Sequence, residues 1–114
     1  MSETIFDKII AKEIPAEIVY EDDHVLAFKD IAPQAPIHVL VIPKQKFKSF
    51  VELEDGDDDV IATYMKRVSK VASELGLDRD GYRVVFNSGK EGGQSVDYIH
   101  AHILGGRQLI WPPG

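Results

Sequence analysis

Two histidines separated by a single residue, His100 and His102, stand near the C-terminal end of the chain. The segment from Tyr98 to Leu104 reads YIHAHIL, so apolar side chains fall between the polar ones. Alternate side chains of an extended strand point to opposite faces, which predicts that Tyr98, His100 and His102 share one face. Two imidazoles side by side on a rigid strand are uncommon in simple core packing, and we interpret the pair as a functional site.

A histidine pair of this kind favours one of two chemistries. In the first, a neutral imidazole attacks an electrophilic centre and forms a covalent intermediate, while the second histidine donates to the charge that develops. The ordinary histidine pKa of about 6.5 makes the neutral form available near neutral pH. In the second chemistry, His38, His100 and His102 supply three nitrogen ligands to a metal ion.

A polar, glycine-rich segment, NSGKEGGQS from Asn87 to Ser95, lies immediately before the histidines. Glycines let a backbone approach an anion closely, and the Asn87, Gln94 and Ser95 side chains add polar groups. The spacing is not that of a Walker-type phosphate loop, and a glycine-rich turn alone is usually only a turn. Its position just before two histidines on one face nevertheless favours phosphate recognition.

Hydrophobic periodicity predicts the elements that must position these residues. A short helix is expected over residues 4–11, capped by Thr4 or Ser2, and a long helix over residues 57–75, with Gly76 as its C-cap. Strands are expected over residues 17–20, 24–29, 37–42, 82–87 and 99–104. This order predicts an α+β fold with a mostly antiparallel sheet of about five strands. The wide apolar stripe of the long helix also suggests contact with a second subunit.

The composition limits the classes of function. The chain has 114 residues, no cysteine and a formal net charge of −6, with 44% hydrophobic residues. We expect one domain with a cytoplasmic location and no membrane association, because no apolar run is long enough to span a bilayer or resembles a leader. The negative charge disfavours nucleic acid as a partner, although backbone N–H groups can still hold a small anion. The lack of cysteine excludes disulfides, thiolate catalysis and cysteine zinc sites.

Over nearly its whole length the sequence resembles the histidine triad (HIT) family, and specifically its HINT-type branch of nucleotide-binding phosphoramidases. The segments that carry the resemblance are TIFDKII, KEIPA, FKDIAPQAPIH, VIPK, GGQS, LGGRQ and the terminal WPPG. The resemblance implies a single HIT domain over residues 1–114 that forms a homodimer and binds a purine nucleoside monophosphate or phosphoramidate, such as AMP or GMP. It implies cleavage of nucleoside 5′-phosphoramidates at the α-phosphorus through a covalent nucleotidyl-histidine, with no metal and no other cofactor.

The resemblance also gives roles to individual positions. His100 matches the nucleophile, and His102 matches the histidine that contacts the α-phosphate. His38 matches a further active-site histidine, and either Ser95 or His38 is expected to protonate the leaving nitrogen. Asp30 matches the carboxylate that bonds the ribose hydroxyls. The other expected nucleotide contacts are apolar walls around the base and polar positions near the phosphate: Phe6, Ile14, Phe28, Ile31, Asn87, Gly93, Gln94 and Ser95.

The strand departs from the family pattern of three alternating histidines. Tyr98 stands at the position of the first histidine, and Asp97 precedes it where an aromatic or apolar residue is usual. In the family, a backbone carbonyl of this strand holds the second ring nitrogen of the nucleophile, and a changed side chain need not remove that carbonyl. We therefore expect an active enzyme with an altered rate or pH dependence. The alternatives are a nucleotide-binding module whose catalysis Tyr98 has weakened or abolished, and a metal-dependent hydrolase.

Overall fold

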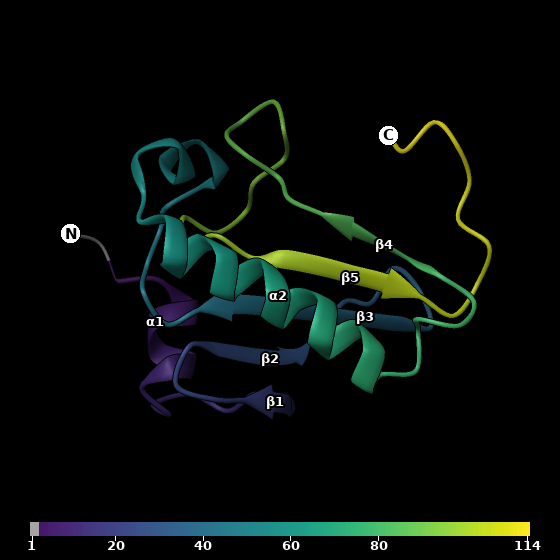
Figure 1. The fold of residues 1–114 in the computed structure, drawn as a ribbon, viewed down its shortest axis with the longest axis horizontal. Helices are drawn as coiled ribbons and strands as arrows, with labels where there is room; N and C mark the ends of the chain where they lie inside the picture. Colours follow the sequence, from purple (N-terminus) through teal and green to yellow (C-terminus); the bar gives the residue numbers. More distant parts are fainter. Residues whose placement is uncertain (1–2) are drawn as a thin grey trace.

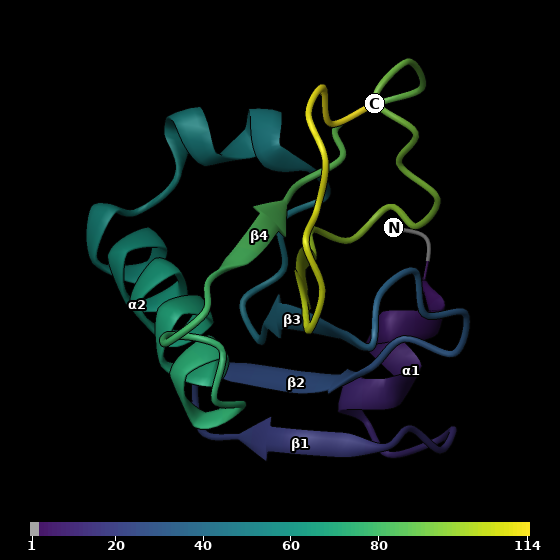
Figure 2. The same cartoon turned by 90° about the vertical axis from the view of Figure 1, so that its right-hand side faces the viewer.

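The computed structural model describes residues 3–114 and contains one five-stranded antiparallel sheet (Figure 1). In space the strands follow the order β1-β2-β3-β5-β4. The two α-helices cover opposite faces of this sheet (Figure 2). The elements in chain order are α1 Ile5–Ile10, β1 Ile18–Glu21, β2 Val25–Lys29, β3 Ile37–Pro43, the 3-10 helix η1 Phe50–Asp55, α2 Asp58–Glu74, β4 Tyr82–Val85 and β5 Ala101–Gly105. The predicted α+β fold is therefore confirmed.

α1 begins after the predicted cap Thr4, and α2 begins after Asp57, the first residue of the predicted long helix. The Thr4 hydroxyl accepts the backbone N–H of Asp7, and the Asp7 carboxylate accepts the backbone N–H of Thr4, which together satisfy two free donors of the first turn. The alternative cap, Ser2, lies outside the described residues. Asp57 accepts the backbone N–H of Val60 at the start of α2, where the helix dipole favours an anion.

Alternation along the strands divides the core into two layers. On β3, Val39 and Val41 pack into the cluster under α2, whereas Leu40 and Ile42 pack into the cluster on the α1 side. The same alternation continues before and within β5. Tyr98 belongs to the α1-side cluster, and the apolar residues between the polar ones belong to the α2-side cluster: Ile99, Ala101 and Ile103. The face predicted for the polar residues of this segment is therefore confirmed.

The pairing of β3 with β5 sets which side chains meet on the α1 side. Leu40 lies opposite His102, and His38 lies opposite Leu104. His38 and His102 are thus diagonal neighbours on adjacent strands, at a separation that long or aromatic side chains can bridge. A one-residue slip in this register would turn the β5 histidines toward the α2 layer.

All five strands lie within two residues of their predicted bounds, β4 and β5 show the largest differences, and one element was not predicted. β5 begins at Ala101 because the backbone N–H of Ile99 donates to the Phe47 carbonyl at 2.8 Å instead of to β3. β4 ends at Val85, and the Asn87 side chain turns to the Gly92 carbonyl of the following loop. Residues 50–55 carry no clear periodic pattern that would predict η1, which is short and has no buried residue. Within the described part of the chain, no helix has both the length and the apolar character needed to cross a membrane.

The Asp22 carboxylate organises the turn between β1 and β2. It accepts the backbone N–H groups of His24 and Val25 at 2.7 and 3.0 Å, the Tyr20 hydroxyl at 2.8 Å and the Arg67 Nε of α2 at 2.6 Å. Partial desolvation acts to raise the pKa of Asp22, but the hydrogen bonds from Arg67 and the other donors outweigh it and hold this pKa well below its usual value. Asp22 therefore ties the edge of the sheet to α2.

We expect Asp22→Asn to lower the free energy of unfolding by about 1–3 kcal/mol at neutral pH, because charge-assisted bonds are weakened or lost. The pKa of Asp22 is depressed in the folded state, so its contribution is present above the unfolded pKa of about 3.9 and is lost as the pH falls below it. Urea unfolding at several pH values measures the difference. Asp23→Asn, at an exposed carboxylate in the same turn, is the matched control. An equal effect of both substitutions would contradict the assignment.

Candidate active site

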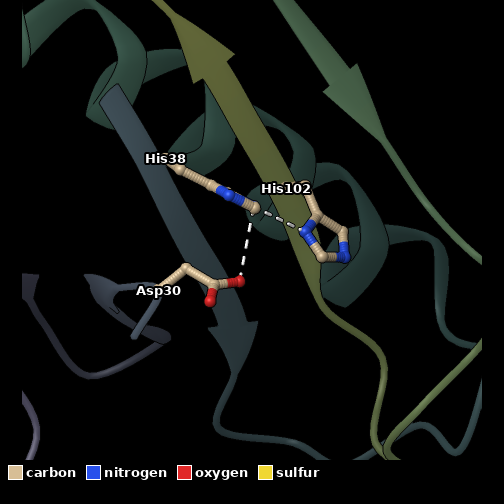
Figure 3. Close-up of side chains that lie close together, drawn as sticks. All are labelled: Asp30, His38 and His102. Atoms are coloured by element: carbon tan, nitrogen blue, oxygen red, sulfur yellow. Dashed lines mark hydrogen bonds and ion pairs between the residues drawn. The ribbon is translucent and has the colours of Figure 1, made fainter. Parts of the chain in front are cut away.

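Three of the four histidines meet on the α1 side of the sheet. His38 comes from β3, His102 from β5, and His100 from the residue just before β5. The ring centroids of His100 and His102 are 4.9 Å apart, and those of His38 and His102 are 5.2 Å apart. Asp30, just after β2, lies beside His38 (Figure 3). The structure thus brings together four residues that the sequence analysis had placed in one site.

The surroundings of His100 fix which of its ring nitrogens carries the proton. Its Nδ1 lies 2.8 Å from the backbone carbonyl of Tyr98, and a carbonyl oxygen can only accept. Nδ1 therefore carries the hydrogen, which leaves a free lone pair on Nε2. The side chain is 5% exposed and packs edge-on against Phe6, with ring centroids 5.0 Å apart. Burial lowers the pKa of His100, although the Tyr98 carbonyl and the Asp30 charge oppose it, so the imidazole is neutral at pH 7.

A chain of hydrogen bonds fixes the opposite tautomer in His102. The backbone N–H of Gln34 donates to His38 Nδ1 at 3.0 Å, so in neutral His38 the proton is on Nε2. That Nε2 lies 2.9 Å from His102 Nδ1 and 3.4 Å from the Asp30 carboxylate (Figure 3). His102 Nδ1 therefore accepts, and its hydrogen is on Nε2. The other carboxylate oxygen of Asp30 accepts the backbone N–H of Ala32 at 2.8 Å, which orients the carboxylate.

His102 is held neutral over a wide pH range. Burial lowers the pKa of His102 to about 4, helped by the neighbouring His100 and His38, while the Asp30 charge acts in the opposite direction. His100 and His102 thus present a nitrogen lone pair and an N–H donor side by side. This combination suits attack on an electrophile whose oxygens gain negative charge during the reaction.

The glycine-rich loop is shaped by contacts within the chain. The Gln94 side chain donates to the backbone carbonyls of Lys48 and Val96 at 2.8 and 2.9 Å, and accepts the backbone N–H of Gly89 at 2.9 Å. Both of its donor hydrogens are therefore used inside the chain. A Cβ atom at Gly92 would lie only 2.5 Å from the Ser88 carbonyl oxygen, so this position requires glycine.

Two further loop positions remain open to solvent. Gly93 is exposed and has a φ of +79°, in the left-handed region that favours glycine. Ser95 is exposed as well, whereas Asn87 is half-buried and its amide donates to the Gly92 carbonyl at 2.7 Å. The Gly93 backbone and the Ser95 hydroxyl are thus the parts of this loop that a ligand can reach most directly.

The apolar residues predicted around the base lie in different environments. Phe6 and Phe28 are buried and pack edge-on against each other, with ring centroids 5.5 Å apart. Ile14 is half-buried and lines a cleft of about 380 Å³ beside the end of α1. Ile31 is 99% exposed, directly after Asp30. An exposed isoleucine directly after a carboxylate offers an apolar surface that a flat ligand could cover.

A candidate set of metal ligands lies in the same place as the histidines. Asp30, His38 and His102 offer one ligand atom each within 4.8 Å of one another among the described residues. The metal alternative from the sequence used His100 in place of Asp30. A metal ion here would have to replace the hydrogen bond between His38 and His102, since those two nitrogens now share a proton.

Known proteins are similar to this chain over nearly its whole length. A HIT domain model matches residues 11–109 of the chain. A "14 kDa zinc-binding protein" from Zea mays is 53% identical over 115 residues, covering 99% of this chain and 89% of that protein. "Adenylylsulfatase HINT1" from Arabidopsis thaliana is 49% identical over 115 residues, covering 99% of this chain and 78% of that one. The structure of a HIT family hydrolase from Legionella pneumophila Philadelphia 1 superposes with a TM-score of 0.93 at 48% identity, covering 98% and 100% of the two chains.

The electrostatics of the site predict how His102 titrates. We expect its ring to stay neutral, with the hydrogen on Nε2, until the pH approaches about 4. Asp30→Asn removes the charge that raises this pKa, so the midpoint should move to still lower pH. Long-range ¹H–¹⁵N correlation spectra measure both the tautomer and the midpoint. Asp23→Asn, in the turn between β1 and β2, is the control and should leave the midpoint in place. A higher midpoint in Asp30→Asn would contradict the charge arrangement.

Proposed function

The chain belongs to the HIT family, and from that premise we propose that it is a purine nucleotide-binding hydrolase acting on nucleoside 5′-phosphoramidates. The observation that carries the proposal is the pair of opposite tautomers side by side, in which His100 offers a lone pair and His102 an N–H donor. The names of two relatives, a HIT family hydrolase and an adenylylsulfatase, support hydrolysis as the reaction type. Residues 1–114 would act as one HIT domain.

The proposed reaction has two steps. His100 Nε2 attacks the α-phosphorus, the phosphorus–nitrogen bond breaks, and the amine leaves after taking up a proton. The resulting positive imidazole ring keeps its Nδ1–H bond to the Tyr98 carbonyl, which stabilises the charge. Water then attacks the nucleotidyl-His100 and releases a nucleoside monophosphate. His102 Nε2–H donates to a phosphoryl oxygen in both steps.

Other residues of the site would bind and orient the nucleotide. Asp30 would accept the ribose hydroxyls, and Ser95 or His38 would supply the proton to the leaving nitrogen. Ser95 is exposed and could reach the leaving group directly. His38 is hydrogen-bonded to His102, so a proton from His38 would pass through the His102 ring. Apolar contacts to the base and polar contacts to the phosphate would come from the remaining predicted positions: Phe6, Ile14, Phe28, Ile31, Asn87, Gly93 and Gln94.

We also propose that the active form is a homodimer located in the cytoplasm. β4 lies at the edge of the sheet and exposes apolar side chains at Tyr82 and Val84, and η1 exposes Phe50 and Val51. An unpaired, apolar sheet edge favours association with a second chain.

AMP and GMP are the expected ligands. The neutral donors of the site would hold their phosphate even though the chain carries a net charge of −6.

The first test is release of AMP from adenosine 5′-phosphoramidate by chelator-treated protein. We expect steady turnover that His100→Ala lowers by about a thousandfold or more, because the nucleophile is removed. His24→Ala removes an exposed histidine in the turn before β2, outside the site, and is the matched control. No turnover by the parent protein, with AMP still bound at micromolar concentration, would instead identify a nucleotide-binding module that has lost its chemistry.

Metal-dependent hydrolysis is the second candidate. It is favoured by the convergence of Asp30, His38 and His102 and by the name of the maize relative, a zinc-binding protein. The same assay separates the two mechanisms. Activity that chelation abolishes and Zn²⁺ restores would support a metal site, whereas activity that is insensitive to chelation would support attack by His100 alone.

The pH dependence of kcat/KM follows from the protonation state of the nucleophile. Only neutral His100 can attack, and burial lowers its pKa below the ordinary value of about 6.5. The acid limb of the profile should therefore fall below pH 6.5, with activity retained above it. Initial rates at low substrate concentration between pH 4 and 8 measure the limb. A midpoint above 6.5 would mean that another group controls the reaction.

A further inference from the structure

The backbone of Tyr98 contacts a residue of the candidate site, and its side chain contacts the central sheet. Its carbonyl accepts the Nδ1–H of His100 at 2.8 Å. Its hydroxyl donates to the carbonyl of Pro43, at the end of β3. The side chain is 1% exposed, so both bonds are shielded from water. One residue therefore links the tautomer of the nucleophile to a fixed point of the sheet.

The backbone that carries this carbonyl is not held by the sheet itself. Pairing between β3 and β5 ends at Val41 and Ala101, before the chain reaches Tyr98. Beyond that point, the backbone N–H of Ile99 donates to the Phe47 carbonyl at 2.8 Å. The Tyr98 hydroxyl supplies the direct connection from this segment to β3, where Pro43 pairs with β2.

The ring of Tyr98 is also held in place. It packs edge-on against Phe6, with ring centroids 6.3 Å apart, and Phe6 in turn contacts the His100 ring. The Lys46 ammonium lies 5.5 Å from the centroid of the Tyr98 ring and pairs with Asp7 at 2.9 Å. Burial raises the pKa of Tyr98, so its hydroxyl remains a protonated donor at neutral pH.

We propose that Tyr98 is a positioning residue for the nucleophile: its hydroxyl, bonded to the Pro43 carbonyl, holds its own backbone carbonyl where that carbonyl fixes the hydrogen of His100 on Nδ1. The inference rests on the proposed function, in which Nε2 of His100 attacks phosphorus. The residue at position 98 then contributes to catalysis without touching the substrate and without exchanging a proton.

The test compares Tyr98→Phe with Tyr64→Phe. Tyr98→Phe removes only the hydroxyl and keeps the ring between Phe6 and Lys46. Tyr64 is a matched control because it is also 1% exposed and its hydroxyl donates to another β3 carbonyl, that of Val41, at 2.8 Å. Tyr64 packs in the α2-side cluster, on the opposite face of the sheet from the Tyr98 side chain. Both variants lose the hydrogen bond of one buried hydroxyl, so both should lose stability.

Only Tyr98→Phe should change the tautomer and the reactivity of His100. We expect a larger fraction of the Nε2–H tautomer of His100 in ¹⁵N spectra, and kcat/KM lower by about 10- to 100-fold, as for other groups that orient an active-site histidine. The bond to the Tyr98 carbonyl raises the pKa of His100, so loosening it should move the acid limb of the pH profile to lower pH. Tyr98→His restores an N–H donor and should recover part of the activity.

The outcomes separate this inference from the proposed function. If Tyr98→Phe loses stability as Tyr64→Phe does but keeps the tautomer, the acid limb and kcat/KM, Tyr98 is only a core residue and the inference is overturned. If the tautomer shifts in Tyr98→Phe but the parent protein does not release AMP, positioning is supported and the proposed hydrolysis fails. Since the NMR measurement needs no turnover, neither result depends on the other.

Discussion

The site depends on the register between β3 and β5. This pairing places Leu40 opposite His102 and sends the side chain of His102, and that of His100 just before β5, toward α1, where burial keeps both neutral. It also brings His38 within hydrogen-bonding distance of His102, although 64 residues separate them in the chain. Side chains alternate along a strand with a period of two. A slip of one residue would therefore turn the side chains of the candidate site into the core and the core side chains toward the site.

In the proposed function, an acidic chain holds a phosphate through neutral donors. The Lys46 ammonium, beside the Tyr98 ring, is already paired with Asp7. The Nε2–H of His102, next to His100, is a neutral donor. Neutral donors cost little to desolvate, and they become more effective where water is excluded. The fixed tautomers thus orient a hydrogen-bond donor toward the proposed phosphate, although the net charge of −6 gives no general attraction for an anion.

The sequence predicted the parts of the structure that depend on local patterns. Alternation in YIHAHIL was enough to place the histidines on one face, and capping residues located both helices. Contacts between distant segments left no such signal. Nothing local connects Tyr98 with Pro43, 55 residues away, or reveals that the Gln94 amide donates to the carbonyl of Lys48. The backbone N–H of Gln34, which sets the tautomer of His38, could not be inferred from residue types, because every residue except proline has one.

That last point also explains why a tyrosine can occupy a position where the family pattern has histidine. As the proposed nucleophile, His100 requires a carbonyl acceptor at Nδ1, and the main chain supplies it whatever the side chain at position 98. What the side chain must do is keep that main chain in place where sheet pairing has ended. Any buried group with a donor that reaches the Pro43 carbonyl meets this need, and the phenol of Tyr98 does so while filling the space beside Phe6. The constraint at this position is therefore on shape and on one hydrogen-bond donor, not on a titratable group near pH 7.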